Sequence, residues 1–319
     1  MQSVPKVVSP IDEHAHGGYE RLLRAAQALP PIRVAVAHPC NREALEAAIE
    51  ARDAGLVVPV LVGPRARIDA LAHEAGIALD GIERVDVEHS HAAAAAAVAL
   101  ARECKVGAVM KGSLHTDELL HAVLDREKGL RTARHISHAF LMDVPNYPRP
   151  LLITDAAVNI APNLAEKADI VQNAIDLMHR VGYERPRVAI LSAVETVNPA
   201  IPSTVEAAAL CKMADRGQIS GGILDGPLAF DNAVSEEAAR IKGIVSPVAG
   251  RADVLVVPDL ESGNMLYKQL VYLAGADAAG VVLGARVPII LASRSDSVRI
   301  RLASCALAVL LAQPRRLAS

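Results

Sequence analysis

The sequence predicts an α/β fold with mostly parallel sheets, and three observations lead to this fold class. From Pro31 onward, short β-branched runs alternate with longer helical patterns, which is typical of repeated βα units. The length of 319 residues is enough for two domains that each have their own core. Hydrophobic residues make up 52% of the chain and charged residues 22%, which is typical of a compact soluble protein with a large aliphatic core.

The first half of the chain begins with a helical lead-in and continues as repeated strands and helices. Asn41 is suited to cap the first helix after the lead-in, and Gly55 is suited to end it. Ser90 precedes an Ala-rich helix, and Thr116 is the expected cap of the last helix in this half. We expect helices at 19–29, 41–55, 66–76, 91–104 and 115–129, and strands at 32–39, 56–63 and 106–113.

The second half begins where the pattern changes from single strands to a pair. Residues 135–155 contain two strand-like runs separated by a proline-rich turn, which predicts an antiparallel hairpin. A helix at 163–182 restores the alternation, and we place the domain boundary near residues 140–145. Further strands are expected at 187–192, 221–226, 253–259 and 280–284.

Composition and charge argue against several classes of function. Only 2% of residues are aromatic, tryptophan is missing and the net charge is −3, so base-stacking surfaces and basic patches are not expected. Apolar stretches such as 92–101 are shorter than the roughly 18 residues of a membrane span. Residues 1–18 lack the pattern of a secretory signal. We therefore expect a cytoplasmic protein that binds neither nucleic acid nor membrane.

Signatures for metals and nucleotides are missing from the sequence. The four cysteines stand far apart, and the histidine pairs at 14–16 and 89–91 have no partners at ligand spacing. Neither GxxxxGK[ST] nor a GxGxxG after a strand occurs, which disfavours P-loop enzymes and ordinary Rossmann dehydrogenases. We therefore expect no metal, no disulfide and no cofactor.

Polar residues gather directly after the predicted strands. Because open parallel sheets bind ligands beyond the carboxyl ends of their strands, we expect these loops to line one cleft. Glu195 and Asp225 stand in two of the loops, either as catalytic carboxylates or as ordinary cap and turn residues. The loops are 110–116, 153–163, 191–199, 225–235, 258–265 and 293–297.

The last of these loops, SRSDS at 293–297, separates an apolar run from an amphipathic stretch. A helix start presents free backbone N–H groups and the positive end of the helix dipole, which suits an anion. Ser and Arg side chains add hydrogen-bond donors for a phosphate. The alternative is that Asp296 or Ser297 caps the helix while Arg294 faces solvent.

Taken in order, these loops resemble the phosphate acetyl/butyryltransferase family. The resemblance runs from about residue 30 to the C-terminus and is densest from 220 to 305. It is closest to the phosphate acyltransferase part of enoyl-CoA hydratase/phosphate acetyltransferase chains. The motifs that carry it are MKGSLHT, ITDAAVNIAP, SAVETVNP, DGPLAFDNAVS, KGIVSPVAGRADVLVVPDLESGNMLYKQL and GARVPIILASRSDSVRIRLAS.

The resemblance implies an enzyme that transfers a short acyl group between CoA and inorganic phosphate, giving acyl phosphate and free CoA. It implies no metal and no cofactor, with CoA as a substrate. It also implies two α/β/α domains similar to those of isocitrate and isopropylmalate dehydrogenases, an active site in the cleft between them, and a homodimer. Residues 1–140 plus 290–319 would form one domain, and residues 141–289 the other.

The resemblance further assigns residues of the loop at 293–297. Arg294 would hold phosphate or acyl phosphate, and Ser293 would lie beside the reacting carbonyl and thiol. Asp296 is the candidate for accepting the thiol proton. Acetyl-specific relatives carry aspartate at the position of Ile300, so three alternatives stay open: Asp296 is the base, phosphate and positioning suffice, or Asp296 only caps the helix.

Residues outside this loop complete the expected site. Gly112, Ser113 and Thr116 would present donors to an anionic ligand at a helix start. Relatives often carry Arg at the position of His121, which leaves Arg131 or Arg134 as substitutes. Four further residues would line the opposite wall of the cleft or hold its loops in place: Asp155, Asn159, Asp225 and Asn232.

The sequence is compatible with three functions to different degrees. The leading hypothesis is a phosphate acyltransferase with acetyl favoured and butyryl open, because DGPLAFDNAVS also looks like the butyryl branch. The alternative is a non-catalytic sensor that binds CoA or acyl phosphate, favoured by Ile300 and His121. A metal-dependent β-decarboxylating dehydrogenase of the same fold is disfavoured, since paired aspartates at helical spacing for Mg²⁺ are missing.

Overall fold

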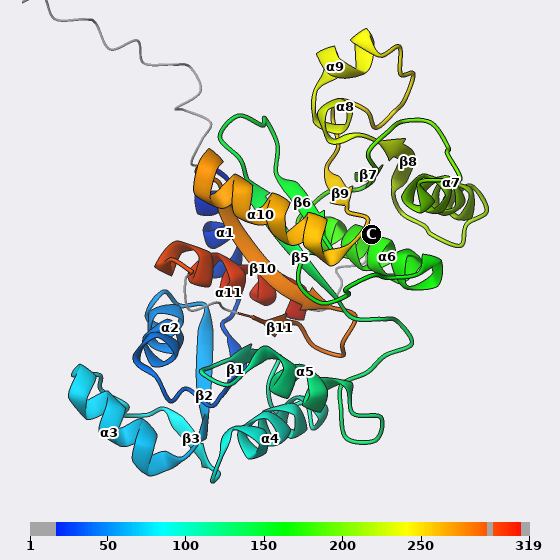
Figure 1. The fold of residues 1–319 in the computed structure, drawn as a ribbon. Coiled ribbons are helices and arrows are strands. Elements are labelled where there is room, and N and C mark those ends of the chain that lie inside the picture. The colour runs from blue at the N-terminus through cyan, green and yellow to red at the C-terminus, as the bar shows by residue number, and fades with distance from the viewer. Residues whose placement is uncertain (1–16, 292–295, 314–319) are drawn as a thin grey trace, which may run out of the picture.

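The computed structural model describes residues 17–291 and 296–313, which form one sheet with helices on both faces (Figure 1). The strands are β1 (Ile32–Ala37), β2 (Val57–Gly63), β3 (Glu83–Asp86), β4 (Ala108–Lys111), β5 (Ser137–Asp143), β6 (Leu151–Thr154), β7 (Arg187–Leu191), β8 (Ile223–Leu228), β9 (Val254–Val256), β10 (Asp277–Leu283) and β11 (Ile289–Ile290). Across the sheet these eleven described strands are ordered β3-β2-β1-β4-β11-β10-β5-β6-β9-β7-β8.

Two groups of parallel strands run in opposite directions and meet at an antiparallel centre. In the first group, β3, β2, β1, β4 and β11 pair in parallel. In the second group, β6, β9, β7 and β8 do the same. Between the groups, β10 pairs antiparallel with β11 and β5, and β5 pairs antiparallel with β6. The mostly parallel α/β fold and the hairpin at 135–155 are therefore confirmed, within one continuous sheet.

Helices cover both faces of this sheet (Figure 1). The helices are α1 (Gly17–Gln27), α2 (Arg42–Asp53), α3 (Arg65–Ala75), α4 (Ser90–Arg102), α5 (Thr116–Leu124), α6 (Leu164–Arg180), α7 (Pro202–Asp215), α8 (Phe230–Val234), α9 (Glu236–Ile241), α10 (Leu260–Ala274) and α11 (Val298–Ala312). In the first half, α2, α3 and α11 share one apolar cluster while α4 and α5 share another. In the second half, α6 and α7 pack in one cluster and α8, α9 and α10 in another.

The start of α2 follows the prediction. Asn41 occupies the cap position with extended backbone, and its side chain accepts a hydrogen bond from the N–H of Ala44 at 3.1 Å. Gly55 takes a φ of 72° directly after the helix, a conformation that glycine adopts without steric cost. The ends of this helix are thus encoded locally.

Two other helix starts differ from the prediction by one residue. Ser90 is the first residue of α4, and Thr116, the expected cap of α5, is the first residue of that helix. The cap of α4 is His89, whose Nδ1 accepts a hydrogen bond from the N–H of Ala92 at 3.1 Å. At α5 the cap position is His115, which makes no side-chain cap bond. The prediction that Thr116 caps α5 was therefore wrong, because this residue already lies in the first turn of the helix.

His138 lies on the central strand β5 and only 1% of its surface is exposed. Its Nδ1 has no hydrogen-bond partner among the described residues. Burial lowers the pKa of His138 to about 3, so the imidazole is neutral at physiological pH. Its ring centroid lies 4.3 Å from that of Phe140, which stacks on Tyr267 of α10 at 3.6 Å. A neutral aromatic row therefore connects the sheet centre to α10.

We predict that Asn41→Ala lowers the free energy of unfolding by about 1 kcal/mol, because the N–H of Ala44 loses its side-chain acceptor. Ser90→Ala is the matched control, since Ser90 sits at a helix start without being the cap. We expect that control to stay within about 0.5 kcal/mol of the original protein. Urea denaturation measures both values, and equal losses would contradict the cap assignment.

We also predict that His138 makes the protein acid-sensitive. Because the folded pKa lies below the unfolded value near 6.5, the stability contribution is complete above pH 6.5 and is lost as pH falls toward about 3. The neutral variant His138→Gln removes this proton uptake. The difference in unfolding free energy between the two proteins should change by about 1.4 kcal/mol per pH unit between pH 6 and 4. Parallel stability curves over this range would show the expectation to be wrong.

Candidate active site

The residues after β4 form a close contact with the end of β1. A Cβ at Gly112 would lie 2.5 Å from the carbonyl oxygen of His38, so the position requires glycine. Ser113 Oγ donates to the same carbonyl at 2.8 Å and lies 3.0 Å from His38 Nδ1. The Ser113 hydroxyl, which we expected to face a ligand, therefore holds two strand ends together in this structure.

His38 is a neighbour of this turn that the sequence analysis did not single out. It takes a φ of 55°, which is uncommon for a residue other than glycine. Burial, followed by the positive charge of Arg67, lowers the pKa of His38. A neutral imidazole therefore sits beside Ser113 at physiological pH. The available signal was its place directly after a buried strand, the same signal that identified the other loops.

The start of α5 adds donors next to this turn. Thr116 opens the helix without a side-chain cap bond, so the first-turn N–H groups keep their capacity for a ligand. Lys111 Nζ lies 3.3 Å from the carbonyl oxygens of Gly112 and Leu114. The carboxylates of the first turn, at residues 117 and 118, offset part of the positive charge. The turn and helix start together have the chemistry of an anion site.

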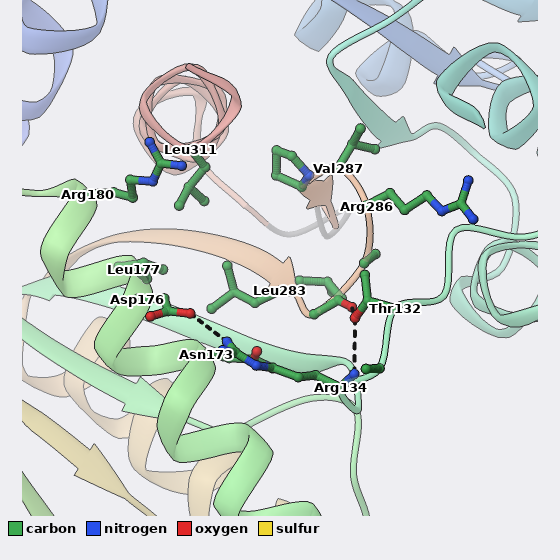
Figure 2. Close-up of a pocket in the computed structure, with 15 residues that line it drawn as sticks. Thr132, Arg134, Asn173, Asp176, Leu177, Arg180, Leu283, Arg286, Val287 and Leu311 are labelled. Carbon is green, nitrogen blue, oxygen red and sulfur yellow. Dashed lines mark hydrogen bonds and ion pairs between the residues drawn. The ribbon is translucent and has the colours of Figure 1, made fainter. Parts of the chain in front are cut away.

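Arg134 lines a separate cavity of about 510 Å³ between α6, the end of α11 and the segments at 132–134 and 284–288 (Figure 2). Figure 2 shows its side chain reaching toward α6, where Nη1 lies 2.5 Å from Asp176 Oδ2. Arg180 and Arg286 also line the cavity. Because Asp176 neutralises Arg134, the charge available to an anionic ligand there is reduced. Arg131 pairs through its backbone with Ala285 and does not line this cavity.

Asp155 and Asn159 shape the loop that follows β6. Asp155 accepts hydrogen bonds from the backbone N–H groups of Ala157, Val158 and Asn159 at 2.9–3.2 Å. Asn159 Nδ2 donates to Asp155 Oδ2 at 2.6 Å and to the carbonyl of Ile136 at 2.8 Å. Burial raises the pKa of Asp155 although these donors oppose the shift. Their observed contacts hold the loop against the start of β5.

Asp225 and Asn232 also make internal contacts. Asp225 Oδ1 accepts the N–H of Gly226 at 2.8 Å. Asn232 Nδ2 donates to Glu195 Oε1 at 2.5 Å, and Lys242 Nζ donates to the same oxygen at 2.6 Å. The bond from Lys242 is the main reason that the pKa of Glu195 is lowered. Glu195 therefore acts here as an ion-paired loop residue, which favours the non-catalytic interpretation of that carboxylate.

Four of the six polar loops line one pocket of about 900 Å³. They follow β6, β7, β8 and β9, whose carboxyl ends lie at the same sheet edge because these strands are parallel. Lys167 and Glu206 form an ion pair in the pocket wall, and the hydroxyls of Ser192 and Ser203 lie 2.8 Å apart. The loop after β4 follows a strand of the opposite direction, and its residues 110–116 do not line this pocket.

Asp296 precedes α11, and of the two cap candidates Asp296 and Ser297 the structure has the second in that role. The cap is Ser297, whose side chain accepts the N–H of Ile300 at 3.3 Å. The carbonyl oxygen of Asp296 accepts a hydrogen bond from Arg301 Nη1 at 2.9 Å. Burial and then the charge of Asp296 raise the pKa of Tyr267 on α10. Ser293 and Arg294, the other expected residues of this loop, lie outside the described residues.

The described residues contain neither a metal site nor a membrane-spanning helix. No group of three or more His, Cys, Asp and Glu side chains in 17–291 and 296–313 is arranged to hold a metal ion. Among the helices described, none has the length and apolarity required to cross a membrane.

Comparisons with known proteins agree on one family. The family model described as "Phosphate acetyl/butaryl transferase" matches residues 90–309. A phosphate acetyltransferase of Rhizobium meliloti is 64% identical over 300 residues, covering 94% of this chain and 95% of that protein. A phosphate butyryltransferase of Clostridium acetobutylicum is 42% identical over 280 residues, covering 88% of this chain and 93% of that protein. The crystal structure of a branched-chain phosphotransacylase from Enterococcus faecalis V583 superposes with a TM-score of 0.78 at 31% identity, covering 89% of this chain and all of that one. The chain belongs to the phosphate acetyl/butyryltransferase family.

Proposed function

We propose that this chain is a phosphate acetyltransferase that interconverts acetyl-CoA plus phosphate with acetyl phosphate plus CoA. The observation that carries this conclusion is 64% identity to a phosphate acetyltransferase over 94% of the chain. Because the chain is also 42% identical to a phosphate butyryltransferase, butyryl-CoA is the second candidate substrate. One methylene changes discrimination by only ~1–3 kcal/mol, so a small difference in the acyl pocket decides between them.

In the proposed reaction, a phosphate oxygen attacks the thioester carbon, the C–S bond breaks, and the thiolate of CoA takes up a proton. Arg294 would hold the phosphoryl oxygens with two parallel N–H bonds, and Ser293 would donate toward the oxygen on which negative charge develops. In the reverse direction, Asp296 would accept the thiol proton before sulfur attacks acetyl phosphate. Positioning and electrostatics thus supply the catalysis.

The contacts of the described residues support this assignment at two helix starts. Since Ser297 performs the capping at α11, the carboxylate of Asp296 is not engaged as the cap. The backbone N–H groups at the start of α5, beside Gly112 and Ser113, suit an anionic ligand. Arg131 and Arg134 would serve the phosphates of CoA, Arg134 after exchanging Asp176 for the ligand. Asp155, Asn159, Asp225 and Asn232 would act by fixing the loops of the cleft.

We further propose that residues 1–140 plus 290–319 and residues 141–289 form two α/β/α domains of the isocitrate dehydrogenase kind, with the reaction in the cleft between them. The continuous sheet is compatible with this division, since β11 pairs with first-half β4.

A cytoplasmic homodimer is the proposed state of the protein. The support is an apolar stripe on the outer face of α10, where Met265, Tyr272 and Leu273 are 64%, 67% and 82% exposed. Apolar side chains gathered on one helix face are typical of an interface.

The alternative function is a non-catalytic protein of the same fold that senses CoA or acyl phosphate. It is favoured by Ile300 and His121, which stand where relatives carry Asp and Arg. Such a protein would bind CoA without breaking the thioester bond, so turnover separates the two functions.

We predict that the purified protein releases free CoA thiol from acetyl-CoA only when phosphate is present. Arg294→Ala should reduce this rate by at least ~100-fold, because the phosphoryl oxygens lose a charged bidentate donor. A thiol-reactive dye measures release, with butyryl-CoA as the parallel substrate and Arg102→Ala on α4 as a surface control. CoA binding without any phosphate-dependent release would favour the sensor.

We predict that Leu273→Glu converts the dimer into monomers, because it places a charge in the apolar stripe of α10. Its side chain is already exposed, so the fold should tolerate the change. Sedimentation measures the mass, and Val58→Glu, at an exposed valine of β2, is the control that should stay dimeric. An original protein that sediments as a monomer would refute the proposed interface.

A further inference from the structure

Arg301 is a largely buried cation on α11, one turn beyond Ser297. Its side chain is 11% exposed. Nη1 donates to the carbonyl oxygen of Asp296 at 2.9 Å, and Nη2 lies 3.1 Å and 3.4 Å from the two carboxylate oxygens of Glu50 on α2. One guanidinium therefore connects the peptide before α11 to a helix of the first half.

This arrangement differs from that of the neighbouring Arg299. Arg299 is 44% exposed, pairs with Asp277 at 2.7 Å, and lies 3.9 Å from the ring centroid of Tyr19. Exposed pairs of this kind contribute little to stability. Burying Arg301 removes a cation from water, and its Nε has no hydrogen-bond partner among the described residues. Replacing a buried ion pair by well-packed apolar residues often leaves the stability of a protein unchanged or raises it. A contribution to stability therefore does not explain why a buried cation occupies position 301.

We propose that Arg301, held in place by Glu50, is a positioning residue that fixes Asp296 for the acyl transfer reaction. This inference rests on the proposed function and extends it to two residues that the family resemblance did not single out. Arg301 acts through the backbone carbonyl of Asp296 and touches no substrate. Glu50 acts one step further away, by fixing the guanidinium.

The geometry explains why a guanidinium is suited to this task. Its planar, rigid fork directs Nη1 to a carbonyl oxygen and Nη2 to a carboxylate without changing rotamer. With the carbonyl held, the peptide plane between Asp296 and Ser297 has little freedom to rotate, so the backbone that carries the carboxylate keeps its position.

The test compares Arg301→Met, Arg301→Lys and Glu50→Gln with the control Arg299→Met. Arg301→Met should lower kcat for phosphate-dependent CoA release by ~10- to 100-fold, the effect of a displacement of about 1 Å at a reacting group, and leave the KM for acetyl-CoA within about twofold. Arg301→Lys should recover part of the rate, because an ammonium reaches one partner at a time. Glu50→Gln should cause a smaller loss of kcat, and Arg299→Met no loss beyond about twofold.

A double-mutant cycle that combines Arg301→Met with Asp296→Asn tests whether Arg301 acts on the rate through Asp296. If Arg301 acts through Asp296, the double variant is no slower than the slower single variant, whereas multiplied losses would overturn the proposal. A kcat for Arg301→Met equal to that of Arg299→Met would also overturn it, as would a loss confined to the KM for acetyl-CoA.

Two controls keep the outcomes distinct. Thermal unfolding of each variant is measured, and if Arg301→Met does not fold, Arg301→Lys and Glu50→Gln decide by the same criteria. The rate of the original protein is measured first. Absence of phosphate-dependent release there would refute the proposed function and the positioning role with it, whereas an active protein with insensitive variants would refute only the positioning role.

Discussion

The antiparallel pairing of β10 with β5 is the interaction on which the rest of the structure depends. It runs from Asp277 opposite Asp143 to Leu283 opposite Ser137 and joins two groups of parallel strands that point in opposite directions. The next strand, β11, turns back and pairs with β4 of the first half. The C-terminal helix α11 is thereby brought against α1 and α2 of the first half while it also packs on β10.

This route places Asp296 between the two halves of the sheet. Its carbonyl is tied through Arg301 to Glu50 in the first half, and its charge contributes to the raised pKa of Tyr267 in the second. A shift of α10 against α11 would therefore change the surroundings of the carboxylate while the backbone stayed fixed. If Asp296 is the proton acceptor of the proposed reaction, the relative position of the two halves would set its surroundings.

Local signals predicted most elements of the fold but few contacts of the site. The cap at Asn41 and the hairpin at 135–155 were predictable, because each depends on neighbours within a few residues. Strand β3 was missed because Glu83–Asp86 is an edge strand rich in charge, which protects an edge but hides the apolar pattern. The partner of Ser113 is 75 residues away, so a tertiary contact decides its role. Asp155 binds backbone N–H groups of its own loop, although its position after a strand had suggested a ligand role. Arg301 gave no sequence signal, since its role depends on a partner 251 residues away.

The burial of Ile300 gives a physical reason why this chain departs from the acetyl-specific pattern. Ile300 is 8% exposed and packs in the second-half cluster that contains Tyr267 and Ala278. An aspartate at this position would be desolvated among apolar side chains, at a cost that an unpaired carboxylate meets only by taking up a proton. A proton acceptor therefore fits poorly at position 300 in this packing. Asp296 is half-buried directly before the same helix, and Ser297 rather than Asp296 is the cap, so the role of proton acceptor proposed for this loop falls on Asp296 rather than on position 300.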